Sequence, residues 1–276
     1  MLLDLAFAAG DRWLQTTLPF IEAAGERLAA WIDHHPHPAW AGYRDDPRFV
    51  LADKRVAPAC PQLVTEERVR SIGPVDHVLA HADFDGFLSA VKYVNGGRSP
   101  YADSDEDGRA IDAPGRGYVC SEKGLRLADA IEWSRDVHSP ERHGKLLREL
   151  AGALRAGKED PALATRVDRL ASERRQRLVD LSHLLDEARD AGSGILVLTV
   201  KSSLRPADKK FLLRELEARG RLVVLEEPGR VTVATFDEEL PLTQLPSLHG
   251  TDGFAWGKGS FATVEGELLG LIGAAA

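Results

Sequence analysis

The sequence is poor in cysteine, lacks a long apolar run and has no excess of basic residues. Its 276 residues include only Cys60 and Cys120 as thiols, which does not suggest a disulfide-stapled secreted domain. No apolar run approaches the roughly 18 residues of a membrane span, and the N-terminus carries Asp4 without the basic region of a secretory signal. The 35 basic and 43 acidic side chains give a net charge of -8, so no overall positive field attracts long nucleic acid. We therefore expect a cytoplasmic protein with neither membrane nor long-duplex partners.

What the chain does contain is typical of a globular protein, with 43% hydrophobic and 28% charged residues. Residues 1–138 hold all the Asp/His clusters, and 139–191 repeat Leu at the three- and four-residue spacing of amphipathic helices. Residues 192–276 alternate a buried strand ("ILVLTV"), a helix ("PADKKFLLRELEARG") and two β-rich runs that predict a hairpin. The pattern predicts an α/β protein in which a helical connector joins a first domain to a smaller α/β domain.

The segment "HVLAHADFDGFLSAVKYV" combines an apolar strand with a cluster of polar side chains. His81, Asp83 and Asp85 stand at alternate positions, and Gly86 allows a tight turn into a helix that we expect to begin near Phe87. Strand ends of this kind gather ligands in α/β sheets. A plain helix cap would explain one Asp, but not a His and two Asp in register.

The segment "IDHHPHP" follows the same pattern, because an apolar run leads into Asp33, His34 and His35. Pro36 and Pro38 then prevent a helix from continuing. The alternative is a polar turn that happens to be rich in histidine. Imidazoles and carboxylates without thiols favour manganese or magnesium over structural zinc. Two such ions about 3.5 to 4 Å apart would activate water and stabilise phosphoryl charge, which indicates a dinuclear hydrolase.

"HADFDG" resembles the His-x-Asp-x-Asp-Gly motif of the DHH phosphoesterase superfamily, and "IDHHPHP" resembles its Asp-His-His motif. The superfamily includes RecJ-type exonucleases, oligoribonucleases, cyclic-dinucleotide phosphodiesterases and family II inorganic pyrophosphatases. The resemblance implies a parallel-sheet catalytic domain with two manganese ions, followed by a smaller substrate-binding domain.

Carried over to this chain, the resemblance implies that His34, His81, Asp83 and Asp85 bind metal. Asp33 and His35 would orient ligands or contact phosphate, so that Asp33, His34 and His35 form the predicted catalytic group. The family also uses an Asp on a short strand before Asp-His-His, often as the metal bridge, and Asp4 in "LLDLAF" takes that place. A later family carboxylate at a strand end is matched by Asp112 in "RAIDAPGRG"; a turn-forming Asp is the alternative.

The motif order departs from the family, since "HADFDG" comes after Asp-His-His instead of before it. The chain resembles a permuted version that starts just before the bridging-Asp strand. The family's C-terminal Gly-Gly-Gly-His-type loop is also altered to "LHGTDGFAWGKGS". We expect a glycine-rich loop there in which five residues bind substrate phosphate: His249, Gly250, Gly257, Lys258 and Gly259. A glycine loop that only covers the sheet is the alternative.

These features predict a phosphodiesterase with two Mn2+ ions, magnesium being the alternative ion, that cleaves short oligonucleotides or linear or cyclic dinucleotides through a metal-activated hydroxide. A phosphoanhydride hydrolase acting on pyrophosphate or polyphosphate, and a catalytically silent nucleotide sensor, remain open. A homodimer is compatible with the sequence.

Overall fold

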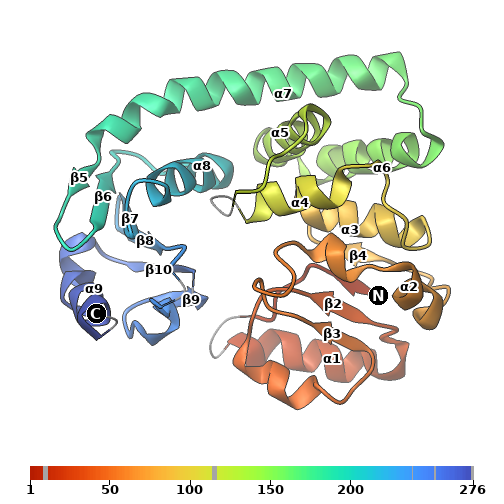
Figure 1. Cartoon of the computed structure of the whole chain (residues 1–276), viewed down its shortest axis with the longest axis horizontal. Helices are drawn as coiled ribbons and strands as arrows, with labels where there is room; N and C mark the ends of the chain where they lie inside the picture. Colours follow the sequence, from red (N-terminus) through yellow and green to blue (C-terminus); the bar gives the residue numbers. More distant parts are fainter. Residues whose placement is uncertain (9–11, 114–116, 238, 252, 275–276) are drawn as a thin grey trace. The chain divides into compact units, whose positions relative to one another are not determined.

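The segments before Asp4, before Asp-His-His and before "HADFDG" form neighbouring strands of one parallel sheet (Figure 1). The computed structural model describes residues 1–8, 12–113, 117–237, 239–251 and 253–274. These residues form two compact units, Met1–Arg175 and Gln176–Ala276. The sheet of the first unit has the order β3-β2-β1-β4 and contains β1 (Leu2–Leu3), β2 (Trp31–Asp33), β3 (Phe49–Leu51) and β4 (Leu79–Ala80). All three pairings are parallel, which confirms the predicted α/β parallel-sheet class.

The strands are apolar at consecutive positions because both faces of this sheet are covered. Leu3 and Ile32 pack into a layer with Cys60 on one face, whereas Leu2 and Trp31 pack into an aromatic layer on the other. Strands β1 and β2 are buried along their whole length, so the polar side chains that follow them lie at the strand ends.

Helices make up the rest of the first unit, and several begin at a side-chain cap. Thr65, Asp83, Ser121 and Ser139 each accept a hydrogen bond from a backbone amide of the first turn that follows. The helices are α1 (Leu18–Ala24), α2 (Glu66–Ile72), α3 (Phe84–Val94), α4 (Ser104–Asp112), α5 (Glu122–Val137), α6 (Pro140–Ala156) and α7 (Pro161–Ser182). Short 3-10 or π-helical segments lie at η1 (Trp13–Thr17), η2 (Gly25–Arg27), η3 (Pro38–Tyr43) and η4 (Cys60–Leu63). None of the helices in these described ranges is long and apolar enough to cross a membrane.

Residues 139–191, expected as a helical connector, contain α6 and α7 followed by η5 (His183–Glu187) and the short strand β5 (Arg189–Asp190). Leu146 and Leu150 of α6 and Val167 and Leu170 of α7 belong to the same apolar cluster as α3 and α5. The boundary between the two compact units falls at Arg175, within α7. The first unit therefore includes α6 and most of α7.

Two local predictions in the first unit are wrong. The strand of "HVLAHADFDG" stops at Ala80, and α3 begins at Phe84 instead of Phe87, because Asp83 caps it through a hydrogen bond from the Gly86 amide. Asp112 ends helix α4 instead of a strand. Acidic residues in the first turn of α4 favour a helix start there, and this signal outweighs the apolar pair before Asp112.

The second unit is built on a mixed sheet of the order β5-β6-β7-β8-β10-β9. Its further elements are β6 (Ile195–Thr199), α8 (Pro206–Glu217), β7 (Leu222–Glu227), β8 (Arg230–Ala234), η6 (Leu242–Gln244), β9 (His249–Thr251), β10 (Phe254–Lys258) and α9 (Phe261–Ala274). β6 and β7 are parallel and joined through α8, whereas β7 and β8 are antiparallel. The predicted strand, helix and hairpin are therefore confirmed, as is the α/β character of this unit.

The expected glycine-rich loop near the C-terminus is instead a β-hairpin of β9 and β10. A side chain at Gly250 would overlap the backbone of Phe254 and Ala255 on the partner strand. A side chain at Gly257 would approach the Ser247 carbonyl to 2.7 Å. Close packing, against the partner strand at Gly250 and against Ser247 and Leu248 at Gly257, therefore accounts for both glycines without a phosphate.

Candidate metal centre

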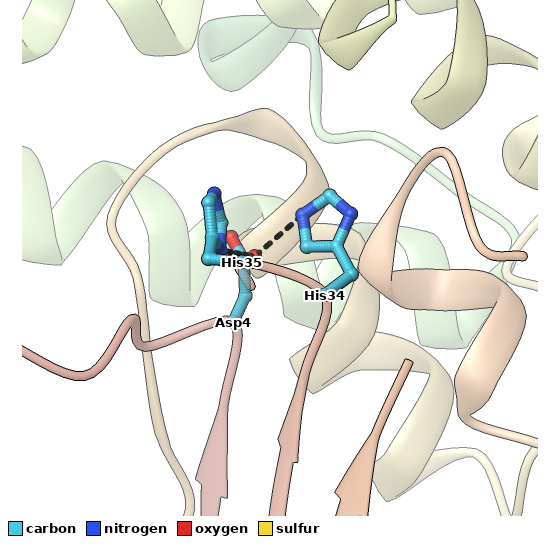
Figure 2. A group of neighbouring side chains, drawn as sticks. All are labelled: Asp4, His34 and His35. Carbon is cyan, nitrogen blue, oxygen red and sulfur yellow. Dashed lines mark ion pairs between the residues drawn. The ribbon is translucent and has the colours of Figure 1, made fainter. Parts of the chain in front are cut away.

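The strand order brings the polar segments together at the carboxyl edge of the parallel sheet. β1 lies between β2 and β4, with Leu3 in register with Ile32 on one side and Ala80 on the other. Asp4 follows Leu3 and therefore lies between the two histidine-bearing segments. Figure 2 shows His34 and Asp4 at the ends of neighbouring strands, with dashed lines joining the carboxylate to the histidines.

Asp4 is a buried carboxylate that approaches both segments. Its Oδ1 lies 3.1 Å from His34 Nε2 and 3.6 Å from His35 Nδ1. Its Oδ2 lies 3.8 Å from His81 Nδ1 on the opposite side. The backbone of Asp4 has φ of 56°, a left-handed conformation that Asp and Asn adopt more readily than most residues.

Three groups of donor atoms in the described residues lie close enough together to hold a metal ion. In each group the ligand atoms lie within 4.8 Å of one another. Asp4 belongs to two of them, and the third contains His34, which faces Asp4. The groups are Asp4, His34 and His35; Asp4, His81 and Asp83; and His34, Asp85 and Asp112.

The residues fit a divalent cation because key donor atoms are buried and make no hydrogen bond of acceptable geometry, although Asp4 Oδ1 and His34 Nε2 lie 3.1 Å apart. Both carboxylate oxygens of Asp4 and the Nε2 atom of His34 are in this state. Burying charged or polar atoms without partners is costly unless an ion or proton compensates them. The donors are oxygen and imidazole nitrogen, while the Sγ of Cys60 is directed to the Ile32 carbonyl 3.6 Å away. This set suits manganese or magnesium better than a structural zinc site.

Neighbouring groups orient the two histidines of Asp-His-His. The Nδ1–H of His34 donates to the Ala57 carbonyl at 3.0 Å, which leaves Nε2 to face the carboxylates. The Nδ1–H of His35 donates to Asp33 Oδ1 at 2.8 Å. Hydrogen bonds of this kind fix the tautomer of a metal-binding histidine and increase the basicity of its other nitrogen.

The carboxylates of "HADFDG" are held by different contacts. Asp83 Oδ2 lies 2.8 Å from His81 Nδ1, and its Oδ1 caps α3. Asp85 lies in the first turn of α3, where its Oδ2 accepts a hydrogen bond from the Cys60 amide and lies 3.4 Å from His34 Nε2. A helix cap and a group of candidate metal ligands are therefore both present in this motif.

The electrostatics favour protonation of the cluster when no cation is bound. Burial by itself lowers the pKa of His34, but the carboxylates of Asp4 and Asp85 raise it to about 11. Burial raises the pKa of Asp4 well above its usual value, and the charge of Asp85 adds to this effect. The pKa of Asp85 is also raised, by burial and by Asp112. A divalent cation would displace such protons, so its affinity should fall as the pH falls.

Three residues near the cluster were not identified from the sequence. Lys54 Nζ lies 2.6 Å from Asp112 Oδ2. Lys92, although buried, donates to the Pro61 carbonyl in the η4 turn, whose Cys60 amide binds Asp85. His143 reaches the Ala82 carbonyl from α6. In the sequence, each of these residues is a single polar residue in a helix or turn, and nothing in the neighbouring residues distinguishes it.

We expect that replacing His143 by Leu will lower Mn2+ affinity about tenfold, as loss of supporting contacts commonly does. The Nε2–H of His143 donates to the Ala82 carbonyl at 3.0 Å, between His81 and Asp83, while its Nδ1 faces the Ser134 hydroxyl at 3.2 Å. Gln can supply one donor and one acceptor, so His143→Gln is the matched control and should retain most of the affinity. Titration calorimetry with Mn2+ measures the difference, and equal affinity in the Leu variant would contradict this role.

His143 should also make stability dependent on pH. Burial lowers its pKa, so below its ordinary value of 6.5 the unfolded chain binds a proton that the folded protein resists. The contribution of neutral His143 to stability is therefore lost as the pH falls through 6.5. We expect His143→Gln to show a flatter loss of unfolding free energy than the wild type between pH 7 and 5, measured by urea denaturation. Parallel curves would exclude this contribution.

The substrate-binding residues proposed near the C-terminus lie in the second unit. His249 and Gly250 belong to β9, Gly257 and Lys258 to β10, and Gly259 follows β10. Their role in substrate binding stays a prediction.

Comparison with known proteins supports the fold. No protein-family model matches the chain, and no curated protein matches it in sequence. A solved pGpG-specific phosphodiesterase from Vibrio cholerae matches with a TM-score of 0.55 at 10% identity, over 90% of this chain and 80% of that one. A manganese-bound RecJ exonuclease matches with a TM-score of 0.47 at 16% identity, over 99% of this chain and 74% of that one. The first of these, a member of the DHH superfamily, shows that the chain has a DHH-type fold, as the two motifs predicted.

Proposed function

We propose that this chain, with its DHH-type fold, is a manganese-dependent phosphodiesterase acting on short oligonucleotides or dinucleotides. The observation that carries the proposal is the position of Asp4. Its carboxylate is buried, lacks a hydrogen-bond partner and belongs to donor groups on both sides of β1. A carboxylate shared between two donor groups would serve both ions of a dinuclear phosphoesterase.

The candidate ligands would form two cation sites. His81, Asp83 and Asp4 would hold one cation, and His34, Asp85, Asp112 and Asp4 the other. Cations bound there would supply an activated water and offset charge on the phosphoryl oxygens.

His35 would have a different role from His34, because the side chain of His35 is about one quarter exposed, whereas that of His34 is fully buried. Asp33 accepts a hydrogen bond from the Nδ1–H of His35. The Nε2 atom of His35 is therefore left to accept a proton or, once protonated, to donate to a phosphoryl oxygen.

The proposed substrate is short because the chain offers little attraction for a long polyanion. The net charge is -8, and binding along a nucleic acid depends on many basic contacts to phosphate. The Vibrio cholerae neighbour is described as specific for pGpG, which makes this linear dinucleotide the first substrate to test.

The test is hydrolysis of a panel of linear and cyclic dinucleotides, with pyrophosphate included, in Mn2+, Mg2+ or chelator. Asp83→Asn is the inactive control, since it should lose metal-dependent turnover while keeping a side chain that can cap α3. Manganese-dependent cleavage of a dinucleotide that is lost in the variant would support the proposal. Cleavage of pyrophosphate alone would indicate a phosphoanhydride hydrolase, and tight nucleotide binding without turnover would indicate a sensor.

A further inference from the structure

A lysine lies directly on the candidate metal centre. Lys54 Nζ is 2.6 Å from Asp112 Oδ2, and the same oxygen lies 3.6 Å from His34 Nε2. The ammonium therefore contacts a carboxylate oxygen that is within reach of the cluster's imidazole. About one third of the Lys54 side chain is exposed, so this side chain is in contact with solvent.

The turn that carries Lys54 is well fixed. Asp53 Oδ1 accepts hydrogen bonds from the Arg55 and Val56 amides, and the Asp53 carbonyl accepts from the Ala57 amide. The Ala57 carbonyl in turn orients His34. The backbone therefore holds Lys54 at the centre, while its flexible four-carbon stem can move the ammonium over a short distance.

The charges of the carboxylates and of the expected cations indicate a role for the Lys54 ammonium. The cluster contains five carboxylates: Asp4, Asp33, Asp83, Asp85 and Asp112. Two divalent cations would leave one negative charge, before an anionic phosphodiester arrives. A cation bound at Asp112 would also repel the ammonium that contacts the same carboxylate. An ammonium that leaves Asp112 but stays at the cluster would favour an anionic ligand there.

We propose that Lys54 is a substrate-binding residue whose ammonium exchanges Asp112 for a phosphoryl oxygen of the substrate once divalent cations occupy the centre. The inference rests on the proposed function and assigns the phosphate contact to this turn of the first unit. A purely structural Lys54 would instead hold Asp112 in place for the metal. The two roles predict opposite changes in metal affinity when the ammonium is removed.

The experiment compares Lys54→Met, Lys54→Arg and the matched control Arg55→Met. Arg55 is the adjacent cation of the same turn, and its side chain is 70% exposed and paired with Asp53. Mn2+ affinity is measured by calorimetry on the metal-free proteins, and kcat and KM are measured with pGpG at saturating Mn2+.

For Lys54→Met we expect Mn2+ affinity equal to or tighter than that of the wild type, and a KM about 10- to 100-fold higher, as for loss of a charge-assisted hydrogen bond. Lys54→Arg should recover part of the KM, and Arg55→Met should leave both constants unchanged. Weaker Mn2+ binding by Lys54→Met, an unchanged KM, or an equal KM rise in Arg55→Met would overturn the inference while leaving the proposed function standing. A wild type that neither binds nor cleaves pGpG or any other dinucleotide of the panel would overturn both.

Discussion

Replacing Asp4 by Asn should reduce manganese-dependent turnover at least about 10³-fold. The cations are expected to contribute several kcal/mol of charge stabilisation, and each 1.36 kcal/mol corresponds to about a tenfold change in rate. Asp4 belongs to donor groups on both sides of β1, so a neutral amide there weakens both. Asn has the same shape and also tolerates the left-handed backbone at this position.

The fold should survive this substitution, because it removes a buried carboxylate that has no hydrogen-bond partner. We expect the metal-free variant to unfold at a temperature no lower than the wild type. Mn2+ should raise the melting temperature of the wild type, since a ligand present at 1,000 times its Kd stabilises by about 4 kcal/mol. The variant should lose this rise. Asp76→Asn, a change at an exposed position, is the control and should behave as wild type in both measurements. Undiminished turnover in Asp4→Asn would remove the basis for the proposed bridge.

The second large effect is expected from Gly86→Ala. A Cβ atom at Gly86 would lie 2.5 Å from the His81 carbonyl oxygen and 3.0 Å from Asp4 Oδ2. Neither neighbour can yield easily, because one is backbone and the other is a buried side chain that faces three histidines. We expect a loss of about 1 to 3 kcal/mol in unfolding free energy, together with displacement of Asp4 and His81.

Urea denaturation and Mn2+ titration test this prediction together. Because Asp4 and His81 belong to the same donor group, Mn2+ affinity should fall about tenfold or more. Gly152→Ala in α6 is the matched control, since nothing lies within 4 Å of the added atom there. That change should stabilise the protein by about 0.5 to 1 kcal/mol. The explanation fails if Gly86→Ala binds Mn2+ like the wild type.

Local sequence patterns were reliable where burial decides the conformation. The strands around Ile32 and Ala80 and the hairpin of β7 and β8 were evident from apolar runs, because such runs reflect burial directly, whereas the strand before Asp4 was implied only by the family resemblance. Local sequence patterns gave a wrong prediction where a side-chain cap determines the start of a helix. The bond from the Gly86 amide to Asp83 starts α3 early, although alternate polar positions had indicated a continuing strand. For "LHGTDGFAWGKGS", glycine content indicated a loop, yet Gly250 allows two strands to approach closely.

The sequence by itself determined the chemistry of the donors and placed most of them at strand ends. Carboxylates and imidazoles after apolar runs meet at one edge of a parallel sheet whatever the order of the strands along the chain. Only the tertiary structure decided that β1 lies between β2 and β4, which makes Asp4 common to both sides. It also brought Lys54 and His143 to the centre from a turn and a distant helix. Strand order and such contacts arise from long-range packing, which leaves no trace in the local spacing of residues.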